Sequence, residues 1–137
     1  IYKILKLPAL NGEYIKEWSL GRKNEIFVIY KKKYIVPTEI KLIEVFSSDS
    51  ILKKIRTLLN NRVFDNVIDV ETYDVIYILN RNDIVGLTSK EKFLFKYTSP
   101  YPLIKICHSN RFLYAYSNKH NKLIVFKRYI YIYDEVS

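Results

Sequence analysis

The feature that most constrains the fold is a series of short apolar segments that recurs through the second half of the chain. Each segment is rich in Ile, Val, Phe or Tyr, and polar turn residues separate it from the next one. The segments are NVIDV (66–70), DVIYIL (74–79), DIVGL (83–87), KFLFKY (92–97), LIKIC (103–107), RFLYAY (111–116), KLIVFK (122–127) and YIYIYD (129–134). Segment starts that are about 8–12 residues apart, with turn residues between them, predict strands joined as antiparallel meanders.

The composition also favours strands over helices. The 137 residues include 19 Ile and 13 Tyr, but only 2 Ala and no Met. Branched and aromatic side chains fit a pleated, half-buried surface, whereas Ala and Leu favour helices. A chain of this length can bury one core, so we expect a single domain over residues 1–137. The missing initiator Met leads us to expect a fragment or a processed product of a longer chain.

The first half predicts fewer strands and one helix. Residues 13–20 fit either a short strand or one helical turn, EIFVIY (25–30) predicts a buried strand, and residues 34–46 predict another strand that Pro37 interrupts. Apolar residues at positions 51, 52, 55, 58 and 59 share one face of a helix, which predicts an amphipathic helix at about 50–61. The expected fold class is therefore α+β, mainly antiparallel sheet in meanders, with this helix packed on one sheet face.

The predicted strands show a faint internal repeat. The pattern of DVIYIL, DIVGL and KFLFKY resembles that of RFLYAY, KLIVFK and YIYIYD, and EIFVIY with the segments after it forms an earlier copy. Units of three or four strands resemble the blades of a β-propeller, which implies a structural part in a larger assembly. Closed propellers have about 4–8 blades. Three units do not close such a ring, so the sequence favours an ordinary antiparallel sheet or barrel, with the propeller-like unit as the alternative.

The positive charge is concentrated in one segment. The chain carries 23 Lys and Arg against 14 Asp and Glu, a net charge of +9. Residues 90–133 hold nine of the basic residues and a single acidic residue, Glu91. Such an excess favours anionic partners, and we expect nucleic acid or an acidic protein. The leading hypothesis is a basic, β-rich binding module without enzymatic activity.

Aromatic residues lie among these charges with the periodicity of strands. Phe112, Tyr114 and Tyr116 share one strand face, and the tyrosines of YIYIYD share another. Basic side chains contact phosphates, and aromatic rings stack on unpaired bases. The expected nucleic-acid or partner-binding residues are Lys96, Lys105, Arg111, Tyr114, Tyr116, Lys122, Lys127, Arg128, Tyr129 and Tyr131. Alternatively, the tyrosines line a second core or an interface between copies of the chain.

One group of residues in the first half has the composition of a metal site. Glu25 opens an apolar strand, and Glu39 and Lys41 lie two residues apart on the next, so they share a face. Converging carboxylates hold Mg²⁺, and a neighbouring Lys can activate the attacking water.

This arrangement resembles the core of the PD-(D/E)xK nucleases over residues 21–79. The resemblance implies a Mg²⁺-dependent DNA endonuclease with Glu25, Glu39 and Lys41 as catalytic residues, and with the two glutamates as metal ligands. The chain departs from that family in having Glu rather than Asp at residue 25, and in having Pro37 two residues before Glu39.

The remaining residues exclude or disfavour other functions. A single Cys, Cys107, excludes an internal disulfide and disfavours a zinc finger. The three glycines form no nucleotide-binding motif. No apolar run approaches about 18 residues, and residues 1–10 do not form a signal-peptide core. We therefore expect an intracellular protein without a membrane partner, and no cofactor other than Mg²⁺ under the nuclease hypothesis.

Overall fold

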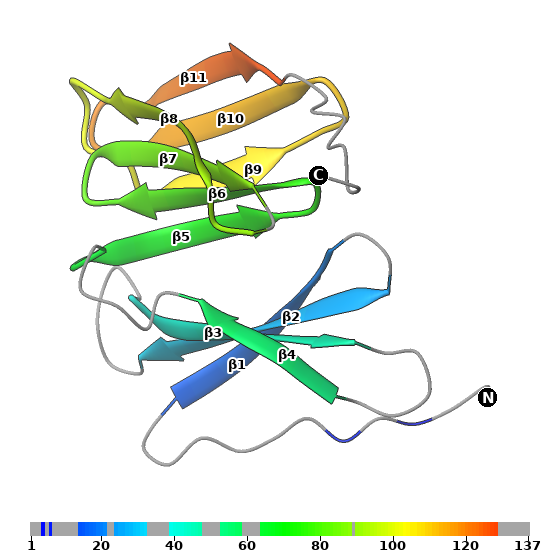
Figure 1. Cartoon of the computed structure of the whole chain (residues 1–137). Helices are drawn as coiled ribbons and strands as arrows, with labels where there is room; N and C mark the ends of the chain where they lie inside the picture. Colours follow the sequence, from blue (N-terminus) through cyan, green and yellow to red (C-terminus); the bar gives the residue numbers. More distant parts are fainter. Residues whose placement is uncertain are drawn as a thin grey trace. The chain divides into compact units, whose positions relative to one another are not determined.

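The computed structural model describes residues 4, 6, 14–21, 24–32, 39–47, 53–58, 64–88 and 90–128. These residues form eleven β-strands and no helix (Figure 1). The strands form three sheets of four, three and four strands, and the strand pairs are antiparallel. The prediction of antiparallel β structure is confirmed. The strand expected at 129–134 lies outside the described residues.

The chain divides into two compact units, Ile1–Ile68 and Asp69–Ser137. In the first unit one sheet forms a meander, in which each strand pairs with the next one along the chain. Its strands are β1 (Tyr14–Leu20), β2 (Glu25–Lys32), β3 (Ile40–Ser47) and β4 (Lys53–Leu58). The segment that fitted either a strand or a helical turn is thus a strand over its described residues.

The predicted helix at about 50–61 is wrong, because the described part of that segment is strand β4. Leu58 pairs with Ile43 and Thr57 with Glu44, so β4 extends the sheet beyond β3. An open sheet edge offers N–H and C=O groups that a neighbouring extended segment satisfies. A short helix gains few hydrogen bonds for its nucleation cost, so this long-range pairing outweighs the helical spacing of the apolar residues. The described chain is therefore all-β rather than α+β.

The core of the first unit is centred on β2. The four consecutive residues from Phe27 to Tyr30 are buried, so both faces of this strand are covered. Val28, Tyr30 and Phe46 form one packed cluster on one of these faces. Burial raises the pKa of the Tyr30 hydroxyl above its usual 10.0, and the nearby Glu44 carboxylate adds to the shift. This phenol therefore stays neutral at physiological pH.

The second unit is built from two further meanders. The four-stranded sheet consists of β5 (Val67–Thr72), β6 (Val75–Asn80), β7 (Asp83–Thr88) and β8 (Phe93–Thr98). The three-stranded sheet consists of β9 (Lys105–His108), β10 (Phe112–Ser117) and β11 (Lys122–Lys127). Short turns join the successive strands within each sheet, which is why the pairing follows the order of the chain.

Strand β9 runs beside β5 in the same direction (Figure 1). The backbone N–H of Ile106 donates to Asp69 Oδ2 at 2.8 Å, and the N–H of His108 donates to Glu71 Oε2 at 3.3 Å. Both partners advance by two residues from the first contact to the second, which fixes the parallel direction. The first strands of the two sheets therefore lie next to each other.

Two contacts identify the face of the four-stranded sheet that packs on the three-stranded one. The hydroxyl of Tyr77 in β6 accepts a hydrogen bond from Arg128 Nε at 3.2 Å. Tyr97 in β8 meets Phe126 in β11 edge to face, with ring centroids 4.9 Å apart. Because side chains alternate along a strand, residues two positions from Tyr77 point the same way. The neighbours of Tyr77 on this face are Val75 and Leu79, both 0% exposed.

Two contacts between the sheets of the second unit, and one pair of strands, share an offset of 37 residues. Ile106 follows Asp69 by 37 residues, and His108 follows Glu71 by the same 37. This offset also carries both ends of β6 onto both ends of β10. The offset between the starts of β7 and β11 is 39 residues instead. The described segments of the three groups in the sequence lie in the three separate sheets.

Gly86 in β7 makes room for an aromatic contact across three strands. It pairs with Tyr77 on one side and Phe95 on the other, and the two rings lie 6.1 Å apart between centroids. A Cβ at Gly86 would lie 2.2 Å from Phe95 Cε1. The missing side chain therefore lets the Phe95 ring cover the middle of the sheet.

Candidate functional site

The carboxylates of the nuclease hypothesis lie at opposite ends of the β2–β3 ladder. Glu25 opens β2 and pairs with Ser47, the last residue of β3. Glu39 lies at the other end, where its carbonyl accepts the N–H of Lys32 at 2.8 Å. A rise of about 3.4 Å per residue puts roughly 20 Å of strand between the two glutamates. Mg²⁺ binds oxygens at about 2 Å, so one ion cannot join them.

Glu39 already has a partner on its own sheet. Lys32 Nζ lies 3.3 Å from Glu39 Oε2, which is a cross-strand ion pair at a partly exposed position. Lys41 is exposed on β3. Among the described residues, no three His, Cys, Asp or Glu side chains gather into a group that would hold a metal ion. The structure brings Glu25 together with neither Glu39 nor Lys41.

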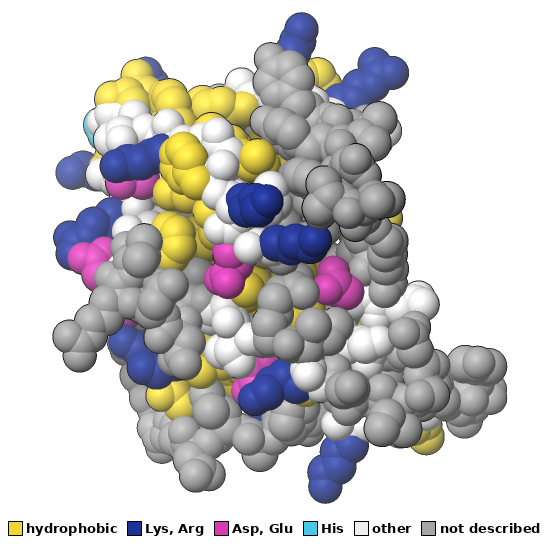
Figure 2. Space-filling view, viewed as in Figure 1, with side chains coloured by type: hydrophobic (Ala, Val, Ile, Leu, Met, Phe, Trp, Pro, Cys, Tyr) yellow, Lys and Arg dark blue, Asp and Glu magenta, His cyan; other side chains and the backbone are white. Residues whose placement is uncertain are grey.

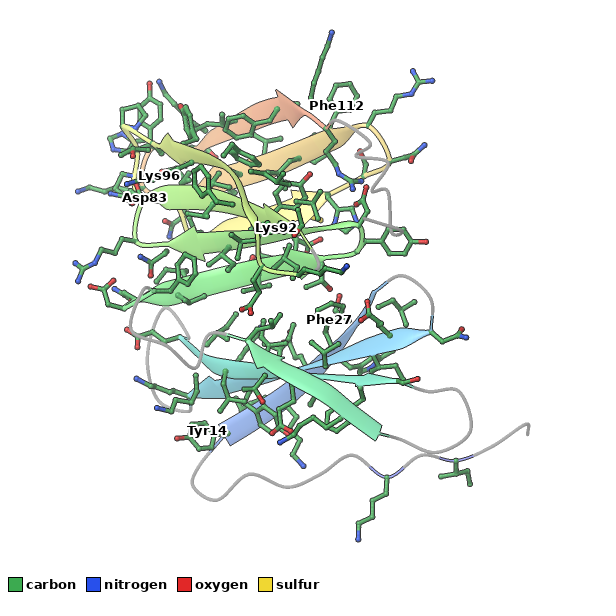
Figure 3. All side chains as sticks on the ribbon, in the orientation of Figure 1. Tyr14, Phe27, Asp83, Lys92, Lys96 and Phe112 are labelled. Carbon is green, nitrogen blue, oxygen red and sulfur yellow. The ribbon has the colours of Figure 1, made fainter. Side chains whose placement is uncertain are left out.

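Two of the basic residues expected to bind a partner are paired with acidic residues. Lys96 Nζ lies 3.8 Å from Asp83 Oδ2, and Figure 3 shows these two side chains next to each other. Lys105 Nζ lies 3.5 Å from Asp69 Oδ2. Both lysine side chains are more than half exposed, at 56% and 57%. Their charge is thus accessible, but the neighbouring carboxylate offsets part of it.

Lys122 is held by an aromatic residue instead. Its Nζ donates to the hydroxyl of Tyr101 at 3.0 Å and lies 4.4 Å from the centroid of that ring.

Figure 2 shows Lys and Arg side chains spread over the visible face, with Asp or Glu side chains beside several of them. Neighbouring carboxylates therefore offset part of the positive charge that a count of Lys and Arg in the sequence assigns to the second unit.

Arg128 has a structural role, because its side chain is only 6% exposed. The guanidinium forms an ion pair with Asp74 and donates to the Ser109 carbonyl at 2.6 Å. The Arg128 Nε donates to the Tyr77 hydroxyl, and its backbone N–H donates to the Arg111 carbonyl at 2.7 Å. Arg128 thus links the turn before β6 to the turn before β10. Its buried guanidinium does not present a surface charge to nucleic acid.

A group of exposed cations lies at one end of the two sheets. Val75 pairs with Thr88, so the turn before β6 and the turn after β7 are at the same end. Arg128 joins this end to the corresponding end of the three-stranded sheet. Four cations here have no acidic partner among the residues that the structure describes. These turn-end cations are Lys90, Lys92, Arg111 and Lys127.

The aromatic row predicted on β10 lies on the less covered face of the three-stranded sheet. Leu113 and Ala115 are 2% and 0% exposed, whereas Tyr116, at an alternate position, is 36% exposed. This less covered surface, called the open face below, consists of the apolar and aromatic residues Cys107, Phe112, Tyr114, Tyr116, Leu123 and Val125, with Lys105 and Lys127 at its margins. Tyr129 and Tyr131 lie outside the described residues.

Carboxylates from β5 cap the free edge of β9. The N–H groups of Ile106 and His108 point away from β10 and donate to Asp69 and Glu71. His108 Nδ1 also pairs with the Glu71 carboxylate. Unpaired N–H groups on an edge strand attract strands of other chains, so these carboxylates protect the edge while they join the two sheets.

Asp69→Ala is expected to lower the free energy of unfolding of the second unit by about 1–3 kcal/mol. The change leaves the buried N–H of Ile106 without its acceptor and Lys105 without its ion-pair partner. Hydrogen-exchange mass spectrometry should show faster exchange in the β9 peptide. Asp83→Ala is the matched control, because its partners Lys96 and Thr98 are exposed. Equal losses in the two variants would contradict the edge-capping role.

The chain matches no known family model, no curated protein and no solved structure. In the part of the chain that the structure describes, no helix combines the length and the apolar character needed to cross a membrane. The open face and the turn-end cations are therefore the candidate functional surfaces of the described residues.

The roles of Asp69, Glu71 and Asp74 do not emerge from the sequence reasoning. These acidic residues precede the basic segment and neutralise or hold residues within it. The signal that would have found them is the 37-residue offset, because it places β5 beside β9. When β5 is aligned with β9 at this offset, Asp69 lies opposite Ile106 and Glu71 lies opposite His108.

Proposed function

We propose that this protein is a sheet-repeat scaffold of the β-propeller type, which functions by docking other protein surfaces. The observation that carries the proposal is the series of three antiparallel meanders in chain order, with a 37-residue offset that relates β5 to β9 and β6 to β10. Propeller blades are antiparallel sheets, typically of four strands, repeated around an axis. Each repeat of such a protein buries its apolar surface against its neighbours.

The offset indicates what the open face does. The β6 residues that pack on the next sheet, Val75, Tyr77 and Leu79, are at most 3% exposed. Their equivalents 37 residues later are the β10 residues Phe112, Tyr114 and Tyr116. In a repeat protein, equivalent positions make equivalent contacts with the following repeat. The open face is therefore suited to another β-sheet of the same kind.

The exposure of β11 supports the same function. Leu123 and Val125 are 58% and 52% exposed, and they extend the aromatic row of β10 across the strand pair. Full burial of such a side chain contributes about 1.5–3 kcal/mol. Contiguous exposed apolar surface marks a site of protein association. The open face thus gains most when a second protein surface covers it.

The 137-residue chain is expected to self-associate through the open face, and Leu123→Lys with Val125→Lys should abolish this association. Two charges at the centre of an apolar contact are desolvated without partners, so the contact becomes unfavourable. Sedimentation velocity up to about 100 μM protein detects complexes of modest affinity. Phe93→Lys is the control, because Phe93 is 64% exposed on β8, outside the open face.

A chain that stays monomeric throughout this concentration range would contradict the proposed contact. Association that survives the double substitution would also contradict it, because a different surface would then be responsible. Loss of association in Phe93→Lys, with association retained in the double variant, would likewise contradict the proposed contact, because Phe93 lies outside the open face.

A further inference from the structure

The turn-end cations form a second surface, and one of them, Lys127, pairs with Phe112 and therefore borders the open face. Lys90 and Lys92 belong to the turn between β7 and β8, Arg111 precedes β10, and Lys127 ends β11. These positions lie at the end toward which β5, β7, β9 and β11 run. Two turns and one strand end therefore present cations at the same end of two neighbouring sheets.

The charge at this end is not balanced by nearby acidic residues. Most acidic residues of the described second unit have a basic partner, in the pairs Asp69–Lys105, Glu71–His108, Asp74–Arg128 and Asp83–Lys96. Glu91 is the acidic residue that lies within the turn-end group. Four positive charges against one negative charge leave an excess that attracts an anionic ligand.

Hydrogen bonds that do not involve the cationic head groups hold these turns in place. The Thr88 hydroxyl accepts the backbone N–H groups of Lys90 and Lys92 at 3.3 and 3.0 Å. The Arg111 carbonyl accepts the backbone N–H of Arg128, whose guanidinium is anchored on Asp74. The backbone is thus ordered, and the side chains of the turn-end cations stay available for a ligand, which reduces the ordering cost of binding.

We propose that the turn-end cations bind an acidic polypeptide segment of a partner protein. Four cations match the few carboxylates of such a segment, whereas a nucleic-acid-binding protein commonly makes about 6–10 phosphate contacts. Single-stranded nucleic acid also needs successive aromatic rings beside the cations. The rings at this end come from three separate elements, Tyr73 in the turn before β6, Phe93 at the start of β8 and Phe112 at the start of β10, whereas the successive rings Tyr114 and Tyr116 continue along the open face.

Fluorescence anisotropy with a labelled oligoglutamate peptide tests this inference on the 137-residue chain. The wild-type chain is expected to bind, with an affinity that falls as salt rises from about 50 to 200 mM. Lys92→Glu with Lys127→Glu should weaken binding about tenfold or more, because two attractions become repulsions. Lys90→Gln with Arg111→Gln should weaken it about threefold, because this pair removes charge without adding acidic residues.

Lys41→Glu with Lys119→Glu is the matched control. It changes the net charge by the same amount at two exposed positions, Lys41 on β3 of the first unit and Lys119 in the turn between β10 and β11, at the opposite end of the three-stranded sheet. Equal weakening in the control would overturn the proposal, because net charge alone would then explain binding. Tighter binding of an oligo(dT) strand, with the same sensitivity to Lys92→Glu and Lys127→Glu, would assign the surface to nucleic acid instead. No binding of oligoglutamate at the lower salt concentration would also overturn the proposal.

Discussion

Arg128→Met is expected to lower the free energy of unfolding of the second unit by about 3–5 kcal/mol. The change removes one partner of an ion pair whose side chains are 6% and 11% exposed, and leaves the Asp74 carboxylate buried without its counter-charge. It also removes the donors to Tyr77 and to the Ser109 carbonyl. Met keeps most of the apolar stem, so the loss reports mainly on the guanidinium.

Hydrogen-exchange mass spectrometry measures this loss in peptides of the second unit, separately from the first. Lys96→Met is the control, because it breaks an exposed ion pair and should cost less than about 1 kcal/mol. Adding Asp74→Asn to Arg128→Met should recover part of the stability, because it removes the uncompensated charge. Similar losses for Arg128→Met and Lys96→Met would show that Arg128 does not link the two sheets.

The strands of the second unit could be predicted because the information that specifies them is local. Alternating apolar residues mark each segment, and Asn, Ser and Pro residues mark the turns between them. Each strand then pairs with its neighbour in the chain, as β6 pairs with β7 across the two-residue turn Arg81–Asn82. No long-range information is needed for a meander.

Strand β4 could not be predicted because its state depends on a distant edge. Apolar residues at helical spacing in residues 51–59 favour a helix, but β3 offers an open edge to that segment. A register shift between Val45 and Phe46 lets β4 follow the bend of β3. The periodicity of residues 51–59 carries no information about β3, so the pairing with β3 determines that this segment forms a strand.

The ion pairs of the candidate binding residues could not be predicted either, because they join residues that are distant in the chain. The excess charge of residues 90–133 is a property of the sequence, but the pairing of Arg128 with Asp74 joins positions 54 residues apart. Lys105 and Asp69 are likewise distant in the chain and 3.5 Å apart in space. A tally of charges therefore identifies the basic segment, whereas the structure decides which of its cations are structural and which face solvent.

The two faces of the three-stranded sheet differ in their burial, and this difference bears on the proposed function. On β10, Leu113 lies on the face toward the four-stranded sheet, and Tyr114 lies on the open face. On β11 the same alternation places Phe126 inward and Leu123 outward. If the open face is a docking surface, the two faces must differ in their contribution to the stability of an isolated copy.

Leu113→Ala is expected to lower the free energy of unfolding of the second unit by about 2–5 kcal/mol. Leu113 is 2% exposed, so the truncation leaves a cavity between the two sheets that the rigid backbone of β10 cannot close. Leu123→Ala is the matched control, since it makes the same change on the paired strand at a side chain that is 58% exposed. That variant should change stability by less than about 0.5 kcal/mol.

The two leucine variants separate packing within one copy from docking between copies. Leu123→Ala should weaken self-association while leaving the stability of the dilute chain unchanged, because its side chain gains burial only when the open face is covered. Leu113→Ala should do the reverse, and lower stability at every protein concentration. If Leu123→Ala destabilises the dilute chain as much as Leu113→Ala does, both faces of the sheet are packed in a single copy, and the open face is not a docking surface.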